Sequence, residues 1–502
     1  MSLKRNILAN YASQIYVMLI GILMVPAYIV YMGAEAYGLV GFFTMLQMWF
    51  QLLDMGLTPT MARETARFNG SAIDALALRR LLRALEGIFI GIAVLGAAAM
   101  MLGSDFITNS WLKVQQLPVE EVQHAIMLMA VIVALRWVSG LYRGAIGGFE
   151  HLVWLSGFNI AVATARFLLV IPVFILVGSS PTEFFSYQLL VAVVELVVVV
   201  VQTYRLMPKV AAEQRIPWQW KPLRGVLKFS LSMAFTSSVW VLVTQTDKLL
   251  LSKLLSLTDY AYFTLAVLVA SGVMVISGPI SGALLPRMTK LNVERDEVGL
   301  IRLYRNATQL VGVIAIPTSL VLALFSEQVL WAWTGDANIV QNAAPILELY
   351  AMGNGVLALG AFPYYLQFAK GDLKLHLIGN VLFLMLLIPS LILATIHHGV
   401  IGAGYAWLGS NIVYFLVWSP IVHKRFIKGL HMKWLLNDIV VILVMSLLGS
   451  TIVFGLVEWP LERMRLTFSI VGVSMGLLLA ASLGSSWVRA AILEKWCTFR
   501  YS

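Results

Sequence analysis

Charged side chains are scarce in this chain. Of its 502 residues, only 12% are Asp, Glu, Lys or Arg, whereas a soluble globular protein carries about 25%. Hydrophobic residues make up 60% of the chain, and the mean hydropathy is +0.85. This balance excludes an ordinary water-soluble domain and indicates a protein that is surrounded by lipid.

Features that would signal an enzyme are also missing. Cys497 is the only cysteine, which excludes disulfides within the chain and cysteine-based zinc sites. No G-x-x-x-x-G-K-[ST] loop occurs, so ATP hydrolysis by this chain has no support. The sequence contains neither a catalytic Asp/His cluster nor a loop long enough for an external catalytic domain. We therefore predict no catalytic residue, no metal site and no cofactor.

What is present is a series of apolar runs of about 20 residues, the length that crosses about 30 Å of hydrocarbon as a helix. The first run is too long for the apolar part of a signal peptide, so we interpret it as a spanning helix. The fourteen predicted spans are 7–32, 37–57, 84–104, 123–145, 152–178, 185–204, 229–255, 260–285, 306–326, 343–366, 376–396, 400–422, 437–457 and 466–487. The expected fold is an all-α polytopic membrane protein.

Basic residues mark one side of the membrane. With Lys4 inside, most of the 35 Lys and Arg residues fall on the inner side, and many acidic residues lie outside. This follows the positive-inside rule and predicts that both termini are cytoplasmic. The net charge of +10 is explained by this topology, so we predict no nucleic-acid partner.

An internal similarity suggests two lobes. The first two spans end in LDMGLTPTMARE (53–64), and the seventh and eighth end in PISGALLPRMTK (279–290). Repeats that flank a central site are typical of transporters. We expect a six-helix lobe over 1–206, a cytoplasmic linker over 207–228, and a second six-helix lobe over 229–422. A C-terminal helix pair and tail would occupy 423–502, and the lobes would enclose a central cavity.

Three segments carry a resemblance to a known family. They are LLDMGLTPTMARETARF (52–68), TQTDKLLLSKLLSLTDYAYFTLA (244–266) and HHGVIGAGYAW (397–407). They resemble the polysaccharide-export and O-antigen flippases, relatives of the multidrug extruders and the lipid II flippase. The resemblance implies transfer of an undecaprenyl-pyrophosphate-linked oligosaccharide from the inner to the outer leaflet of the bacterial cytoplasmic membrane. It also implies alternating access of two lobes. Because ATP hydrolysis has no support, we expect the energy to come from an H⁺ or Na⁺ gradient or from consumption of the flipped product. The expected partners are membrane lipids and a polymerase or co-polymerase complex.

Three charges lie at one depth of the predicted bundle. Arg136, Arg166 and Glu195 fall near the midpoints of the fourth, fifth and sixth spans. A charge at that depth costs about 2.5–3.5 kcal/mol on insertion scales, so all three should face protein or water. Arg143 follows Arg136 by seven residues and returns to the same helix face. Because guanidinium groups bind phosphate oxygens bidentately, we predict Arg136, Arg143 and Arg166 as substrate-binding residues.

Structural interpretations of these charges remain open. Arg166 and Glu195 could form a bridge between helices, and Arg143 could be an ordinary inner-side cation. On the seventh span, Asp247 and Lys248 point about 100° apart, so we expect each to need its own partner. We predict Lys248 as a further substrate-binding cation, with Asp247 and Glu195 as ion-coupling or salt-bridge residues.

Four polar residues are candidates for the cavity wall. Gln47, Gln51 and Asp54 share one stripe of the second span, and Gln245 lies beside Asp247. A polar seam between packed helices explains the stripe equally well.

Two other functions compete with a flippase. A multidrug or cation antiporter would need an acidic cavity, whereas the charges at mid-depth here are mostly basic. A membrane glycan polymerase or ligase would show the long loop or Asp/His cluster that this chain lacks. A lipid II flippase variant stays open, because its lipid anchor has the same chemistry.

Overall fold

The computed structural model describes residues 3–209, 218–224, 226–457 and 459–490, and the chain divides into two compact units, Met1–Ala261 and Tyr262–Ser502. The first unit contains α1 (Leu3–Met32), α2 (Ala34–Phe50), η1 (Gln51–Asp54), α3 (Leu57–Asn69), α4 (Ala75–Leu102), α5 (Ser104–Phe106), η2 (Ile107–Trp111), α6 (Val119–Gly148), α7 (Leu152–Ala163), η3 (Thr164–Leu168), α8 (Val170–Leu176), α9 (Pro181–Leu206), α10 (Lys221–Arg224) and α11 (Leu227–Leu254).

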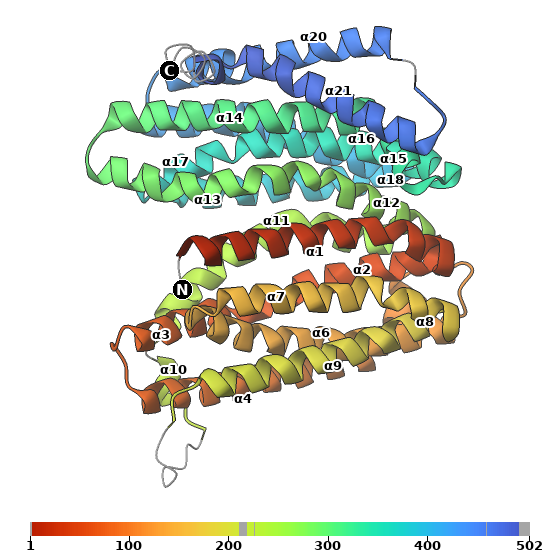
Figure 1. Cartoon of the computed structure of the whole chain (residues 1–502), viewed down its shortest axis with the longest axis vertical. Coiled ribbons are helices and arrows are strands. Elements are labelled where there is room, and N and C mark those ends of the chain that lie inside the picture. Colours follow the sequence, from red (N-terminus) through yellow and green to blue (C-terminus); the bar gives the residue numbers. More distant parts are fainter. Residues whose placement is uncertain (1–2, 210–217, 225, 458, 491–502) are drawn as a thin grey trace. The chain divides into compact units, whose positions relative to one another are not determined.

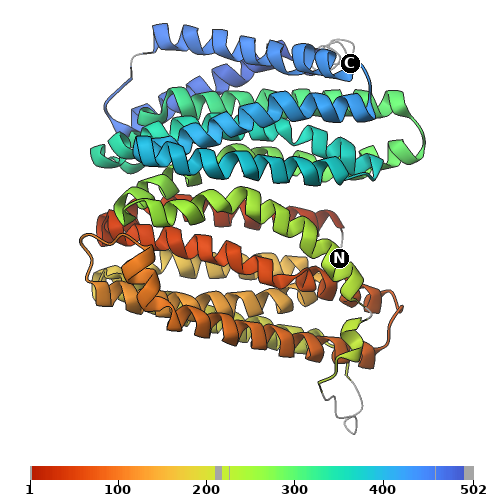
Figure 2. The same cartoon turned by 180° about the vertical axis from the view of Figure 1, so that it is seen from behind.

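α12 (Leu257–Ala270) crosses the boundary between the units. The second unit continues with α13 (Gly272–Val293), α14 (Glu297–Leu324), α15 (Ser326–Thr334), α16 (Ala337–Gly360), α17 (Phe362–Lys370), α18 (Lys374–Phe426), α19 (Leu430–Trp434), η4 (Leu435–Val440), α20 (Val441–Leu456) and α21 (Arg463–Gly484). Within each unit the long helices run roughly side by side (Figures 1 and 2).

The helices confirm the predicted all-α, multi-pass membrane fold. Twelve helical segments of the described chain are long and apolar enough to cross a membrane. One of them, α18, has 53 residues and would measure about 80 Å as a straight helix, far more than a bilayer. Gly399 interrupts it with a left-handed φ of 60°, between the predicted spans 376–396 and 400–422. The predicted seventh span, α11, is 28 residues long but is not one of the twelve.

The centre of the first unit is α6, which packs against α3, α4 and α9. Gly144 and Gly148 lie one helical turn apart on the face that contacts α3. A Cβ at Gly144 would come within 2.8 Å of the Thr58 carbonyl oxygen, and one at Gly148 would collide with the Ala62 carbonyl. These glycines therefore let the two backbones approach closely, as small residues do in membrane helices. α11 packs on α2 and α3 of the same unit. The predicted division into six-helix lobes stays a prediction.

Residues 111–117, which we call the 111–117 strap, join two distant parts of the first unit. The buried Glu35 carboxylate at the start of α2 accepts hydrogen bonds from the backbone N–H groups of Gln115, Gln116 and Leu117, at 2.5, 2.8 and 3.0 Å. The other end of the strap holds the turn between α11 and α12. There Lys113 O accepts from Leu257 N (3.0 Å), Lys113 Nζ donates to Leu254 O (2.7 Å), and Trp111 Nε1 donates to Ser252 Oγ (3.0 Å).

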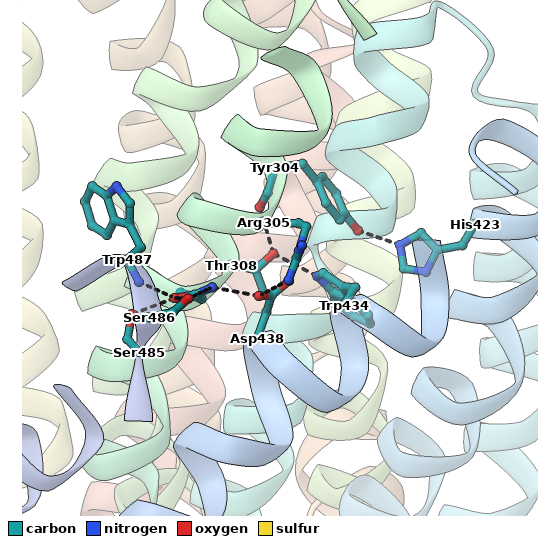
Figure 3. Close-up of polar contacts among 10 residues, drawn as sticks. Tyr304, Arg305, Thr308, His423, Trp434, Asp438, Ser485, Ser486 and Trp487 are labelled. Carbon is teal, nitrogen blue, oxygen red and sulfur yellow. Dashed lines mark hydrogen bonds and ion pairs between the residues drawn. The ribbon is translucent and has the colours of Figure 1, made fainter. Parts of the chain in front are cut away.

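In the second unit, a partly buried ion pair attaches the C-terminal helices to α14 (Figure 3). Asp438 lies in η4 and is fully buried, and it accepts from Arg305 Nε (2.6 Å) and Arg305 Nη2 (2.9 Å). Gln309 Nε2 donates to the same carboxylate at 2.7 Å. Gln309 Oε1 in turn accepts from Ser485 Oγ (2.7 Å) and Trp487 N (3.0 Å). This Arg305–Asp438 cluster connects α14, η4 and the segment after α21.

Candidate functional site

A cavity of about 460 Å³ in the first unit, which we call the arginine cavity, brings five of the ten predicted site residues together. Arg136 and Arg143 from α6, Arg166 from η3, and Glu195 from α9 all line it. Gln47 from α2 and several residues of α1 and α7 complete the wall. Arg136, Arg166 and Glu195, which were expected to face protein or water, all border this one cavity.

Glu195 is the only acidic residue that lines this cavity in the described chain, and it faces three arginines. Its Oε1 accepts from Arg143 Nη2 at 2.7 Å, and its Oε2 lies 4.0 Å from Arg136 Nε. Arg143 also donates to Asn159 Oδ1. The predicted alternative, a bridge between Arg166 and Glu195, does not form within 4.0 Å; Glu195 pairs with Arg143 instead. The group carries three positive charges against one negative charge.

Besides Glu195, neutral side chains hold the guanidinium groups, and two of these groups keep unused donors. Arg136 donates from Nη2 to Gln188 Oε1 (2.9 Å) and from Nη1 to Gln47 Oε1 (3.3 Å), and it lies 5.4 Å from the centre of the Phe43 ring. Arg166 lies against the Phe167 ring at 5.3 Å. In the described chain, Arg136 Nε and Arg166 Nε are buried without a hydrogen-bond partner. Buried donors without partners are costly, so this arrangement is suited to an anionic ligand.

A π-helical turn places Arg166. In η3 the backbone bond runs from Leu169 N to Thr164 O at 3.0 Å, five residues back. Three carbonyls of this turn accept from side chains of neighbouring helices. The donors are Tyr187 Oη to Ala165 O, Gln188 Nε2 to Arg166 O and Tyr28 Oη to Phe167 O, each at 2.8 Å. π-turns inside α-helices occur frequently at functional sites, and this one is secured by α1 and α9.

Gln188 connects two of the cations, since its amide accepts from Arg136 and donates to the Arg166 carbonyl. We expect Gln188→Met to lose both bonds and to lower the free energy of unfolding by about 2–3 kcal/mol, because one of them involves a charged partner. The measurement is the thermal unfolding midpoint of the purified protein in detergent. Gln14→Met is the matched control, because the exposed Gln14 lines the same cavity and makes only one long bond, to Asn10 (3.3 Å). Equal unfolding midpoints for the two variants would show that the hydrogen bonds of Gln188 to Arg136 and Arg166 do not stabilise the protein.

The polar stripe on the second span lines a second cavity of about 350 Å³. Gln47, Gln51 and Asp54 border it together with Arg136. Asp54 also accepts from Thr58 Oγ1 at 2.5 Å, and so it helps to begin α3. Because Gln47 and Arg136 border both cavities, the stripe extends the polar lining of the arginine cavity within the first unit.

Lys248 and Asp247 behave differently from the prediction. We expected these neighbours not to neutralise each other, yet Lys248 Nζ lies 3.5 Å from Asp247 Oδ1. The lysine side chain folds back along its own helix and donates to Thr244 O at 2.7 Å, which makes the approach possible. Neither residue borders the two cavities described above, and Gln245 is absent from both linings as well. The predicted roles of Lys248, Asp247 and Gln245 stay predictions.

Asn159 is a cavity residue that the sequence analysis missed. Gln188 does not line the cavity, but its side chain contacts the Arg136 guanidinium and the Arg166 carbonyl. A signal for both existed in the sequence. Asn159 precedes Arg166 by seven residues and Gln188 precedes Glu195 by seven, the same spacing that relates Arg136 to Arg143. Seven residues bring a helix back to the same face, so each span supplies two polar residues to one side. In the described chain, no group of three or more His, Cys, Asp or Glu side chains could hold a metal ion.

Comparisons with known proteins identify the family and the fold of the chain. The family model described as "Polysaccharide biosynthesis protein" matches residues 3–292. No curated protein matches the sequence. Among solved structures, the chain is similar to the lipid II flippase MurJ in an inward closed conformation (TM-score 0.70, 14% identity, 98% of this chain and 100% of MurJ covered).

Two further solved structures share the fold. One is an inward-facing multidrug resistance MATE family transporter of the MOP superfamily (TM-score 0.69, 16% identity, 84% of this chain and 96% of that chain). The other is a MOP superfamily transporter from Pyrococcus furiosus with a binding pocket of reverse polarity (TM-score 0.53, 15% identity, 85% of this chain and 94% of that chain). The chain therefore shares the fold of MurJ and of these MOP superfamily transporters.

Proposed function

The chain belongs to the polysaccharide biosynthesis protein family, and from this premise we propose that it flips a lipid-linked oligosaccharide across the membrane. The proposed substrate is an undecaprenyl-pyrophosphate-linked repeat unit of a surface polysaccharide such as O-antigen. The proposed direction is from the cytoplasmic to the periplasmic leaflet of a bacterial inner membrane, with both termini in the cytoplasm. A polymerase or co-polymerase complex would use the flipped product.

One observation carries the proposal: three arginines surround a single glutamate in one cavity of the first unit. A diphosphate headgroup is strongly hydrated and cannot enter hydrocarbon unaided. Guanidinium groups with unused donors offer it charge-assisted hydrogen bonds in place of water. The excess positive charge favours an anion over the organic cations that a multidrug or cation antiporter would carry. A membrane glycan polymerase or ligase has no support from family or fold.

The site also suggests how the ligand and Glu195 compete. Arg143 is engaged by Glu195 at 2.7 Å. An arriving diphosphate would attract the same guanidinium, and the released carboxylate would then be able to take up a proton or a sodium ion. Glu195 is the better placed of the two proposed coupling residues, because it lines the arginine cavity and Asp247 does not. Alternating access of two lobes around a central cavity completes the proposed cycle.

The test is reconstitution of the purified chain into vesicles with a defined undecaprenyl-diphosphate oligosaccharide. Glycan that reaches the outer leaflet is detected by an added lectin or glycosidase, with and without an imposed ion gradient. We expect flipping that depends on the diphosphate, so that a matched monophosphate-linked glycan is transported more slowly. Equal transfer of both lipids, or transfer of an organic cation alone, would argue against this function. In cells, gene deletion should cause lipid-linked repeat units to accumulate.

A further inference from the structure

A second polar cavity, of about 290 Å³, lies in the second unit next to the Arg305–Asp438 cluster. Its wall consists of Val298, Ile301, Arg302, Arg305, Asn306 and Gln309 from α14, with Ser486 from the segment after α21. We call it the α14 pocket. It is separate from the arginine cavity of the first unit, with which it shares no residue.

The α14 pocket has an excess of positive charge. Arg305 uses Nε and Nη2 for Asp438, and its Nη1 makes no hydrogen bond in the described chain. Arg302 lies one turn earlier on the same helix, is exposed, and has no carboxylate of the described chain within 4.0 Å. No acidic residue lines the pocket. One guanidinium is therefore uncompensated, and a second presents one free edge.

The neutral groups of the pocket narrow the choice of ligand. Gln309 is fully occupied by Asp438, Ser485, Ser486 and Trp487, so it forms a fixed wall. Figure 3 shows this group of contacts from α14 to the segment after α21. Asn306 supplies an amide and Ser486 a hydroxyl beside the arginines. A guanidinium with amide and hydroxyl donors is a typical environment for a phosphate.

The surroundings point to a lipid. Val298 at the mouth of the pocket is 70% exposed, and Trp487, the residue after Ser486, is 37% exposed. Tryptophan is enriched where a membrane meets water, and exposed aliphatic side chains there contact acyl chains. The positive-inside rule predicts that this end of α14 lies on the cytoplasmic side. Basic pockets between membrane helices on that side bind anionic lipid headgroups.

We propose that the α14 pocket binds the phosphate headgroup of an anionic phospholipid from the cytoplasmic leaflet, with Arg302 as its principal cation. The lipid would sit where the C-terminal helices join α14, so it would stabilise that junction. This proposal concerns the second unit alone and does not depend on what the first unit transports.

The test measures lipid binding by the full chain without any transport assay. Purified protein is placed in nanodiscs of phosphatidylcholine, with or without added phosphatidylglycerol, and retained phosphatidylglycerol and the thermal midpoint are recorded. We expect phosphatidylglycerol to raise the midpoint and to be retained. Arg302→Ala should weaken retention about fivefold, the amount that one basic residue contributes near anionic lipid. Arg302→Lys should restore most of it, because the charge returns.

Arg80→Ala provides the matched control, since Arg80 is an exposed arginine on the same predicted side but in the first unit. It should leave retention unchanged. A second arm adds inorganic phosphate to protein in phosphatidylcholine alone. Protection by phosphate that equals that of phosphatidylglycerol and disappears in Arg302→Ala would identify a free-anion site and overturn the lipid assignment. Equal retention by Arg302→Ala and Arg80→Ala would overturn the pocket itself.

Discussion

Arg136→Ala and Arg166→Ala are each expected to abolish flipping of a diphosphate-linked glycan while the protein still inserts into the membrane. Both residues border the arginine cavity with a buried Nε that lacks a hydrogen-bond partner in the described chain. Losing the charge-assisted bonds from one guanidinium to a phosphate costs about 3 kcal/mol, or about 100-fold in binding. The measurement is the initial flipping rate in vesicles that contain equal amounts of inserted protein.

The controls for these arginines separate charge from shape. Arg136→Lys and Arg166→Lys keep the charge but lose the planar fork, so they should give intermediate rates. Arg205→Ala removes an exposed arginine at the end of α9, and this variant should flip the substrate at the normal rate. If both cavity alanine variants flipped substrate at full speed, Arg136 and Arg166 would be structural residues and the anion-binding role would have to be abandoned.

The largest effect on stability is expected from Asp438→Leu. Asp438 is fully buried and accepts two hydrogen bonds from Arg305 and one from Gln309. Its removal leaves a guanidinium without its counter-charge. Breaking a fully buried pair costs about 3–5 kcal/mol, and because the Arg305 side chain is 30% exposed we expect a loss at the low end of that range. Thermal unfolding in detergent should show the loss, and limited proteolysis should reveal looser attachment of α20 and α21.

A double substitution tests whether the effect comes from the ion pair itself. Adding Arg305→Met to Asp438→Leu removes both charges, and apolar replacement of a buried pair is often close to neutral. The double variant should therefore recover most of the stability that the single variant loses. Glu462→Ala is a suitable control, because the Glu462–Arg465 pair is exposed on both sides and contributes at most about 1 kcal/mol. A double variant no more stable than Asp438→Leu would show that the pair is not the source.

The sequence was informative wherever a single helix determines the answer. Apolar length predicted the spans, and the seven-residue spacing of Arg136 and Arg143 predicted that they share a face. Depth along separate spans was enough to bring Arg166 and Glu195 to the same cavity, because neighbouring helices of a bundle run side by side.

The same reasoning could not predict which side chains of distant helices contact each other. Asp438 is 133 residues from Arg305, and nothing in either segment identifies the other as its partner. The choice of Arg143 rather than Arg166 as the partner of Glu195 depends on rotation of the helices, which apolar length does not set. The π-turn at 164–168 has no periodic signature, yet it determines where Arg166 points. The expectation that Lys248 and Asp247 do not neutralise each other was wrong for a different reason. A long, flexible lysine side chain can reach back to the neighbouring carboxylate.

The 111–117 strap has a mechanical consequence for the first unit. Seven residues fasten the beginning of α2 to the α11–α12 turn through Glu35 at one end and Lys113 at the other. The strap thereby ties the start of α2 to the α11–α12 turn, two segments that are far apart in the chain. A movement of one of them relative to the other would have to break hydrogen bonds at one end of the strap. A route that opened on that side would either carry both segments as a single flap or peel three amides away from one carboxylate.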